Sequence, residues 1–223
     1  MYWRQGWEKA PYICRRCADS WYEKNPSDNV FLLDRDNVSD YFNIDKFIDS
    51  SSKKISVQSY TDILRTNLLW KYGGVWCDAT VFCNKGLSKW MPTDSFFSFS
   101  SPTKDRMVSS WFMYAPKRNY VIGKWRSEVK SYWLERKHPD NYYWFHLLFS
   151  EIYKDPQVKC LWDKQTKISC QIETSSGPHF FWPYTKKRMG HISRVGVPID
   201  IPVFKLRYNK NLESYDVIKE IIS

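Results

Sequence analysis

Asp62, Arg65 and Asp78 are the residues of this chain whose types and spacing best suit chemistry. Asp62 and Arg65 are three residues apart in a segment with helical periodicity, so both lie on one face of the predicted helix. The helix ends at Gly73-Gly74, because glycine adopts positive φ without a Cβ penalty, and the apolar segment 75–77 predicts a short buried strand. Asp78 follows that strand, at the end where open α/β sheets bind ligands. This layout suits a sugar nucleotide, with one carboxylate for a metal ion or a ribose and an Asp/Arg pair one helix earlier.

These side chains also have structural interpretations. Ser59-x-x-Asp62 fits a helix capping box, and Asp62 with Arg65 fits a surface ion pair worth about 0.3–0.5 kcal/mol. Asp78 favours function more strongly, because a carboxylate at the end of an apolar strand is costly unless something compensates it. Asp34-Arg-Asp36 has the Asp-x-Asp spelling but lacks the preceding glycine pair. We interpret it as an exposed turn.

Periodicity and turn residues predict helices and strands that alternate through the first half of the chain, which is typical of an α/β fold with a partly parallel sheet. The predicted helices span residues 11–25, 38–47, 58–72, 120–135 and 142–152. The predicted strands span residues 29–34, 75–77, 95–100, 110–115 and 203–206. After residue 152 the sequence predicts mainly loops, with a basic run at Lys186-Lys-Arg188.

The segment from Thr61 to Thr80 resembles the core of the capsular polysaccharide synthesis glycosyltransferases, relatives of the DXD sugar-binding glycosyltransferases that include the clostridial toxin catalytic domains. The shared pattern is Asp-x-x-Arg on a helix, then Tyr-Gly-Gly, an apolar pair, and Asp-x-Asp or Asp-Ala-Thr. This chain carries it as Asp62, Arg65, Tyr72-Gly-Gly74, Val75-Trp76 and Asp78-Ala-Thr80. Further matches follow in order at Trp3–Pro11, Ser110–Ala115, Tyr143–His146, Ser176–Pro178 and Phe204–Tyr208.

The resemblance implies a GT-A-like nucleotide-diphosphosugar transferase fold, with a central mixed sheet flanked by helices, in a single domain over residues 1–223. Tyr2-Trp3 would fall inside the first strand, so the chain could also be one domain of a longer protein. The implied activity is transfer of a hexose from a nucleotide-diphosphate sugar, most simply a UDP-sugar, to a hydroxyl of a glycan or lipid-linked glycan, with retention of configuration. Asp62 would then contact sugar hydroxyls, and Arg65 the donor.

A divalent cation, Mn²⁺ or Mg²⁺, is the implied cofactor, with Asp78 as its ligand. Enzymes of the toxin type carry a second acidic residue where this chain has Thr80, and a hydroxyl is a poor substitute for a carboxylate toward these ions. Three outcomes stay open: weak metal binding, Asp78 with a ligand from elsewhere, or no metal. His179 is our candidate for the missing ligand, and His191 is a weaker one.

Other candidates are more distant from the motif, and each has a plain packing alternative. Trp3 and Gln5 are at the expected end of the first strand, where the fold receives the base, and Trp76 is either core or a wall against the nucleotide. Lys205 and Arg207 could stabilise the departing diphosphate. His146 is a candidate for the acceptor site.

The composition favours one folded domain and an acidic partner. The chain has 223 residues, is 43% hydrophobic and 18% aromatic, and carries a net charge of +10. That charge suits phosphate-bearing substrates, an anionic membrane or nucleic acid. No apolar run approaches the roughly 20 residues of a membrane span, and no signal peptide is visible. We therefore expect a cytoplasmic protein, able to contact a membrane peripherally.

Cytoplasmic cysteines are usually reduced, and no second CxxC accompanies Cys14-x-x-Cys17, so we expect these two to pack on a helix. Two alternatives to the enzyme remain. One is a basic, aromatic-rich nucleic-acid-binding module, although no nucleic-acid motif occurs and no specific nucleic acid is expected. The other is a catalytically inactive relative that still binds the sugar nucleotide.

Overall fold

The computed structural model describes residues 1–175, 177–208 and 216–222, and the chain divides into two compact units. Unit 1 comprises Met1–Asp34, Cys77–Met91 and Ile168–Ser223, and unit 2 comprises Arg35–Trp76 and Pro92–Lys167. Ser176, the first residue of one sequence match, lies outside the described residues. Within those residues, every helix is too short or too polar to cross a bilayer.

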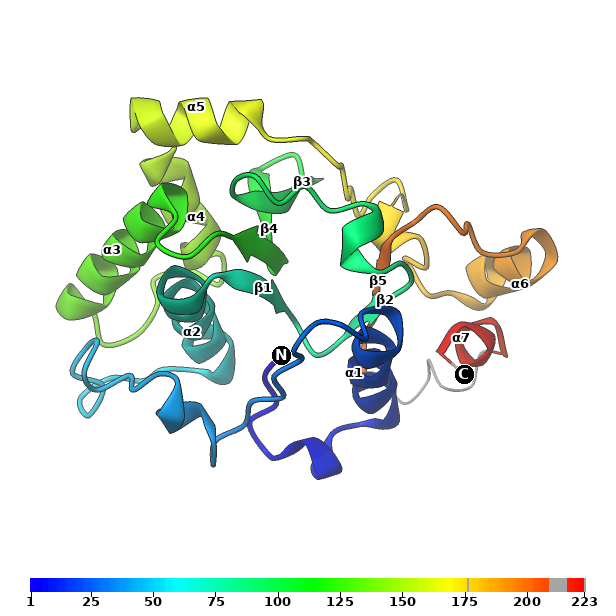
Figure 1. Cartoon of the computed structure of the whole chain (residues 1–223), viewed down its shortest axis with the longest axis horizontal. Coiled ribbons are helices and arrows are strands. Elements are labelled where there is room, and N and C mark those ends of the chain that lie inside the picture. The colour runs from blue at the N-terminus through cyan, green and yellow to red at the C-terminus, as the bar shows by residue number, and fades with distance from the viewer. Residues whose placement is uncertain (176, 209–215, 223) are drawn as a thin grey trace. The chain divides into compact units, whose positions relative to one another are not determined.

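Unit 2 is built on a three-stranded sheet with strand order β1-β4-β3 (Figure 1). Its elements are α2 (Val57–Tyr72), β1 (Gly74–Cys77, whose last residue begins unit 1), β3 (Phe97–Thr103), β4 (Arg106–Ala115), α3 (Tyr120–Glu135), α4 (Trp144–Ile152) and α5 (Pro156–Lys164). β3 and β4 form an antiparallel hairpin. α2 and α4 both contact β4, α3 contacts α2 and α4, and α5 packs against α3.

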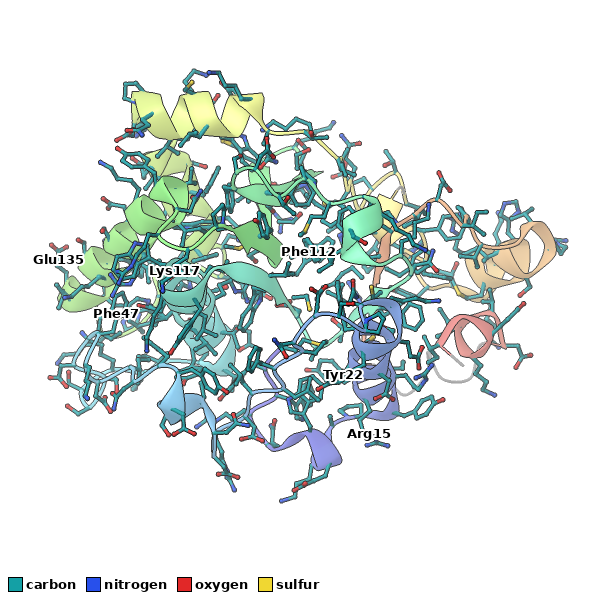
Figure 2. The ribbon with its side chains drawn as sticks, viewed as in Figure 1. Arg15, Tyr22, Phe47, Phe112, Lys117 and Glu135 are labelled. Carbon is teal, nitrogen blue, oxygen red and sulfur yellow. The ribbon has the colours of Figure 1, made fainter. Side chains whose placement is uncertain are left out.

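The core of unit 2 is largely aromatic, which is where much of the aromatic content of the chain is used. Trp125 of α3 stacks on Phe145 of α4 with ring centroids 4.2 Å apart, and Phe99 of β3 stacks on Trp111 of β4 at 5.1 Å. Figure 2 shows Phe112 on β4, where its side chain is fully buried. Large rings of this kind bury much apolar area, so these pairs help to hold α3 against α4 and β3 against β4.

α2 has defined ends. Its N-cap Ser56 accepts a hydrogen bond from the Ser59 amide. At its other end Gly73 has φ 76°, and a Cβ on Gly73 would lie 2.6 Å from the Lys117 backbone nitrogen. Only glycine fits this position, because both the positive φ and the close backbone approach exclude a side chain. The chain therefore leaves α2 sharply and enters β1.

Unit 1 holds a two-stranded antiparallel sheet of β2 and β5, covered by α1. Its elements are α1 (Tyr12–Lys24), β2 (Val81–Cys83), α6 (Lys186–Val195), β5 (Val203–Lys205) and α7 (Asp216–Ile222). The indole of Trp21 in α1 donates to the Val81 carbonyl at 2.8 Å, and the Ser20 hydroxyl accepts from the Cys83 amide at 2.9 Å. α7 contacts both α1 and α6 (Figure 1).

Four 3₁₀ helices complete the regular structure of the described residues. They are η1 (Trp7–Lys9), η2 (Val38–Asp40), η3 (Leu87–Lys89) and η4 (Gly177–His179). Mixed α/β structure is confirmed, but the described residues form two small sheets in place of the one central sheet that we expected.

Three local predictions were wrong. Segment 29–34 forms no strand, only an isolated parallel bridge between Tyr2 and Leu33. Leu33 is buried, but Phe31 is 53% exposed, so the apolar run is only partly buried. Segment 38–47 forms only η2, because polar side chains such as Asn43, which accepts from the Lys46 amide, favour turns over helix. The C-terminal part contains α5 and α6 where loops were predicted.

Candidate active site

Asp78 begins the tight turn that joins β1 to β2. The Val81 amide donates to the Asp78 carbonyl at 3.0 Å, so Asp78-Ala-Thr-Val81 is a four-residue turn, and Asp is favoured at its first position. Trp76 and Cys77 before the turn are buried, whereas the Asp78 side chain is 30% exposed. The sequence motif therefore places a partly accessible carboxylate directly after the two buried residues that end β1.

Lys205 binds both polar side chains of this turn. Its Nζ lies 3.0 Å from Asp78 Oδ2 and donates to Thr80 Oγ1 at 2.8 Å. The antiparallel pairing sets Lys205 opposite Val81, and the Leu206 amide donates to the Thr80 carbonyl at 2.8 Å. The Lys205 side chain is only 19% exposed. A mostly buried ammonium group is thus held by one carboxylate and one hydroxyl.

Trp3 packs against a small apolar cluster that includes one residue of this turn, Ala79. The cluster comprises the buried residues Ala10, Cys14 and Ala79 of unit 1, and Trp7 packs against it as well. The indole Nε1 of Trp3 is buried and meets no hydrogen-bond acceptor among the described residues. A buried N–H without an acceptor is costly, so an acceptor atom on a ligand would gain a full hydrogen bond there. Gln5, two residues later, is exposed in a turn.

Asp62 and Arg65 form a second cluster, inside unit 2. The Arg65 Nη1 lies 3.3 Å from Asp62 Oδ1, and the two side chains are 5% and 14% exposed for Arg65 and Asp62 respectively. Arg65 also donates from Nη1 to the Ser110 carbonyl at 2.6 Å and from Nε to the Thr61 carbonyl at 3.1 Å. The pair is buried, so the alternative interpretation from the sequence, a surface ion pair, does not apply.

Aromatic rings surround the Arg65 guanidinium. Its carbon lies 5.2 Å from the centroid of Trp76 and 5.6 Å from that of Phe145. Cation–π contacts of this kind are stronger when the cation is desolvated. Trp76 is therefore a buried packing partner of Arg65. Asp62, the more exposed member of the pair, is the side chain of this cluster that a ligand reaches more easily.

The remaining candidates lie on other segments of the fold. His146 is half-buried on α4, with its ring 6.2 Å from those of Tyr143 and Phe145. His179 ends η4, which packs against β5, and His191 is exposed on α6. Arg207 is exposed, with its guanidinium carbon 4.0 Å from the Trp182 ring.

Comparison with known proteins identifies the family of this chain. The family model for the capsular polysaccharide synthesis protein matches residues 1–221. The chain belongs to this family. No curated protein sequence matches it. Among solved structures, "PaToxG Glycosyltransferase" matches with 15% identity and a TM-score of 0.53, over 100% of this chain and 83% of the other. That likeness concerns the fold, and together with the family it supports an enzyme of the glycosyltransferase type.

The donor set at the turn of this capsular polysaccharide synthesis protein does not fit a divalent cation. Mn²⁺ and Mg²⁺ prefer several anionic or neutral oxygen ligands, whereas Asp78 supplies one carboxylate and Thr80 one hydroxyl, and Lys205 binds both. In the part of the chain that the structure describes, no three His, Cys, Asp or Glu side chains gather as a metal site. Asp78 and His179 therefore belong to no such group, and Cys14 and Cys17 are buried in α1.

Sequence reasoning named Lys205 and Asp78 and noted Thr80, but it missed that Lys205 binds the other two and that a tyrosine hydroxyl supports it. The Tyr184 hydroxyl donates to the Lys205 carbonyl at 2.8 Å, and burial raises the pKa of Tyr184, which keeps that hydroxyl protonated. Lys205 and Thr80 are 125 residues apart. No local spacing signals such a contact, because it arises only from the pairing of β2 with β5.

Proposed function

We propose that this protein transfers a hexose from a nucleotide-diphosphate sugar, most simply a UDP-sugar, to a hydroxyl of a glycan or lipid-linked glycan, with retention of configuration. The observation that carries the proposal is the Asp78–Thr80 turn with Lys205 bound to it, at the end of a buried strand in a chain of the capsular polysaccharide synthesis family. A carboxylate and an ammonium group together suit a ligand that has both hydroxyls and phosphates.

In unit 1 the turn would bind the nucleotide part of the donor. The Asp78 carboxylate would accept hydrogen bonds from ribose hydroxyls, and Lys205 would offset the negative charge that develops on the departing diphosphate. Trp3 would stack on the base or donate its buried indole N–H to it, since this group meets no acceptor among the described residues. Gln5 is exposed and could supply amide hydrogen bonds.

In unit 2 the Asp62 carboxylate would accept hydrogen bonds from the hydroxyls of the sugar. Arg65 would hold that carboxylate in place, because its guanidinium binds Asp62, the Ser110 carbonyl and the Thr61 carbonyl together. A planar guanidinium can serve several acceptors in fixed directions, which lysine cannot. The direct contact of Arg65 with the donor, expected from the family, would need this arrangement to change.

The transfer itself would be a front-face displacement. A bond forms between the acceptor oxygen and the anomeric carbon, the bond from that carbon to the phosphate oxygen breaks, and the acceptor proton passes to the departing diphosphate. No side chain in the motif serves as a covalent nucleophile in this scheme. The contribution of the protein is to position the reactants and to stabilise charge.

Calorimetric titration with UDP and UDP-glucose, together with assay of UDP release, tests the proposal. We expect Asp78→Ala to weaken UDP binding by about tenfold or more, because a charge-assisted hydrogen bond contributes roughly 1.5–3 kcal/mol. Asp36→Ala is the matched control: Arg35 and Asp36 lie in an exposed turn, so this variant should bind as the wild type does. Failure of the folded wild type to bind either nucleotide would exclude a UDP-sugar donor. Binding without turnover for any acceptor would favour the inactive relative.

Peripheral membrane contact is a further part of the proposal, suited to a lipid-linked acceptor. Lys186, Lys187 and Arg194 are exposed on α6, and the adjacent Val195 and Ile199 are 61% and 85% exposed. Basic and apolar side chains together favour binding to anionic lipid surfaces.

Sedimentation with phosphatidylglycerol-containing vesicles tests this contact. The bound fraction should fall when Lys186, Lys187 and Arg194 are changed to alanine together. The same loss of charge at the exposed Lys9, Lys104 and Lys137 should leave it nearly unchanged. Equal effects of the two triple variants would show that net charge alone is responsible.

A further inference from the structure

The Lys205 ammonium group occupies the place between two side-chain oxygens that a cation bound to this turn would use. A divalent ion held by residues 78 and 80 would need Asp78 Oδ2 and Thr80 Oγ1 at about 2.0–2.6 Å. Lys205 Nζ already lies 3.0 Å from the first oxygen and 2.8 Å from the second. An ammonium and a divalent ion cannot both occupy that place, because of their size and their repulsion.

Lys205 is also held in position, unlike an ordinary surface lysine. Its backbone is paired with Val81, its carbonyl accepts from the Tyr184 hydroxyl at 2.8 Å, and the next residue, Leu206, donates to the Thr80 carbonyl. The side chain is 19% exposed. Part of the side chain thus remains open to a ligand such as a phosphate, while withdrawal of the lysine would break a partly buried ion pair and leave Asp78 without that partner.

We propose that Lys205 replaces the divalent cation in this protein, so that the ammonium group neutralises the donor diphosphate and catalysis proceeds without Mn²⁺ or Mg²⁺. Thr80 then has a role of its own, because its hydroxyl accepts the hydrogen bond that orients Lys205. A second carboxylate at this position would instead make the turn a metal site. This inference rests on the proposed function for the diphosphate, but the exclusion of a metal ion from the turn can be tested on its own.

The first test measures Mn²⁺ binding to the protein without nucleotide, by electron paramagnetic resonance. We expect the wild type to leave the signal of free Mn²⁺ unchanged, and the double variant Thr80→Asp/Lys205→Ala to reduce it, because this variant restores two carboxylates without the ammonium. Lys104→Ala, which removes an exposed charge at the turn between β3 and β4, should behave as the wild type. Wild-type Mn²⁺ binding that disappears in Asp78→Ala would overturn the proposal, as would a folded double variant that binds no Mn²⁺.

Calorimetric titration of UDP with EDTA or with Mn²⁺ is the second test. Wild-type affinity should be the same within about twofold in the two buffers, and Lys205→Met should lower it about tenfold or more in both, since a charge-assisted contact to phosphate is lost. UDP binding by the wild type that requires Mn²⁺ would overturn the proposal. Circular dichroism melting confirms that each variant is folded.

The two tests separate the possible failures. A folded wild type that binds UDP in neither buffer would refute the UDP-sugar donor of the proposed function. The Mn²⁺ result would still decide whether Lys205 excludes a divalent cation from the turn, because that measurement uses no nucleotide.

Discussion

Arg65 and Asp62 form an ion pair with Nη1 and Oδ1 3.3 Å apart, and both side chains are mostly buried. The same guanidinium donates to the carbonyls of Ser110 on β4 and Thr61 on α2. One side chain therefore links the motif helix to the central strand of its sheet and fixes the carboxylate beside it. Under the proposed function, this arrangement would divide the work of the pair, with Arg65 as the positioning residue and Asp62 as the group that binds the sugar.

Arg65→Lys should destabilise the fold although the charge is kept. A single ammonium cannot replace the fork that serves three acceptors, so at least one buried acceptor loses its partner, at a cost of about 1–3 kcal/mol. Urea denaturation of the purified variant measures this loss. Arg126→Lys, in the same unit, is the control. It also removes a guanidinium group, but one that donates to a single side chain, that of Asn67. An Arg65→Lys variant as stable as the wild type would show that the buried bonds contribute little.

Asp62→Asn should lower both stability and turnover. Asparagine keeps the size of the side chain but removes one charge of a mostly buried ion pair, so we expect a loss of about 1–3 kcal/mol in unfolding free energy. Loss of a charged hydrogen bond to the sugar should lower kcat/KM by about 10- to 100-fold. The rate at which hydrolysis of UDP-glucose releases UDP measures this loss of kcat/KM. Unchanged kcat/KM would remove Asp62 from the site.

Gly73→Ala should be much more harmful than Gly74→Ala. Both glycines have positive φ, 76° and 87°, so each alanine incurs a conformational cost of about 1–3 kcal/mol. Only Gly73 has a neighbour in the way: a Cβ there would lie 2.6 Å from the Lys117 nitrogen, whereas a Cβ on Gly74 would meet nothing within 4 Å. Thermal denaturation should therefore give a lower Tm for Gly73→Ala. Equal Tm values would mean that the loop after β4, which contains Lys117, shifts to accommodate the added Cβ.

The sequence was most informative where local rules decide the structure. The helix predicted at 120–135 coincides with α3 (Tyr120–Glu135), whose N-cap Asn119 accepts from the Ile122 amide, and the motif helix differs from α2 by one residue at its start. α5 had a local signal that we overlooked, since Asp155 caps it and Pro156 begins it, a combination typical of helix starts.

Contacts between distant segments were beyond such rules. Neither the binding of Lys205 to Asp78 and Thr80 nor the packing of Trp3 against the cluster that contains Ala79 follows from residue spacing, because each depends on how segments far apart in the chain pair within unit 1. Asp78 could be identified because its cost at a strand end is local. The ammonium group of Lys205 offsets this cost. From the sequence, Lys205 could be named only as a candidate for contact with the diphosphate.

Cys160 should be the thiol that reacts in the native protein. It is exposed on α5, whereas Cys14, Cys17, Cys77, Cys83 and Cys170 are buried. Reaction needs an accessible thiolate, and burial raises the pKa of Cys83 to about 11. N-ethylmaleimide at pH 7.5 should add one group by mass spectrometry, and none to Cys160→Ser. In denaturant all six cysteines of the chain should react. Rapid addition of several groups to the native protein would contradict the burial.

Cys77 should make the protein less stable at alkaline pH. Burial raises the pKa of its thiol from 9.0 to about 12 in the folded chain, so the unfolded chain loses this proton first as the pH rises. The stabilisation is therefore fully present below about pH 9 and is lost progressively toward pH 12. Between pH 8 and 10.5 this single group should account for a fall of about 1–2 kcal/mol in unfolding free energy.

A comparison of variants isolates this contribution, because other groups titrate in the same range. Burial lowers the pKa of Lys167 to about 8, which acts in the opposite direction between about pH 8 and its ordinary value. Urea denaturation at pH 8 and pH 10.5 should show a smaller fall for Cys77→Ala than for the wild type. Cys160→Ala, which removes an exposed thiol, should show the wild-type fall. The same pH dependence in all three proteins would mean that Cys77 is solvated in the folded chain and that the end of β1, where Asp78 begins its turn, is open to water.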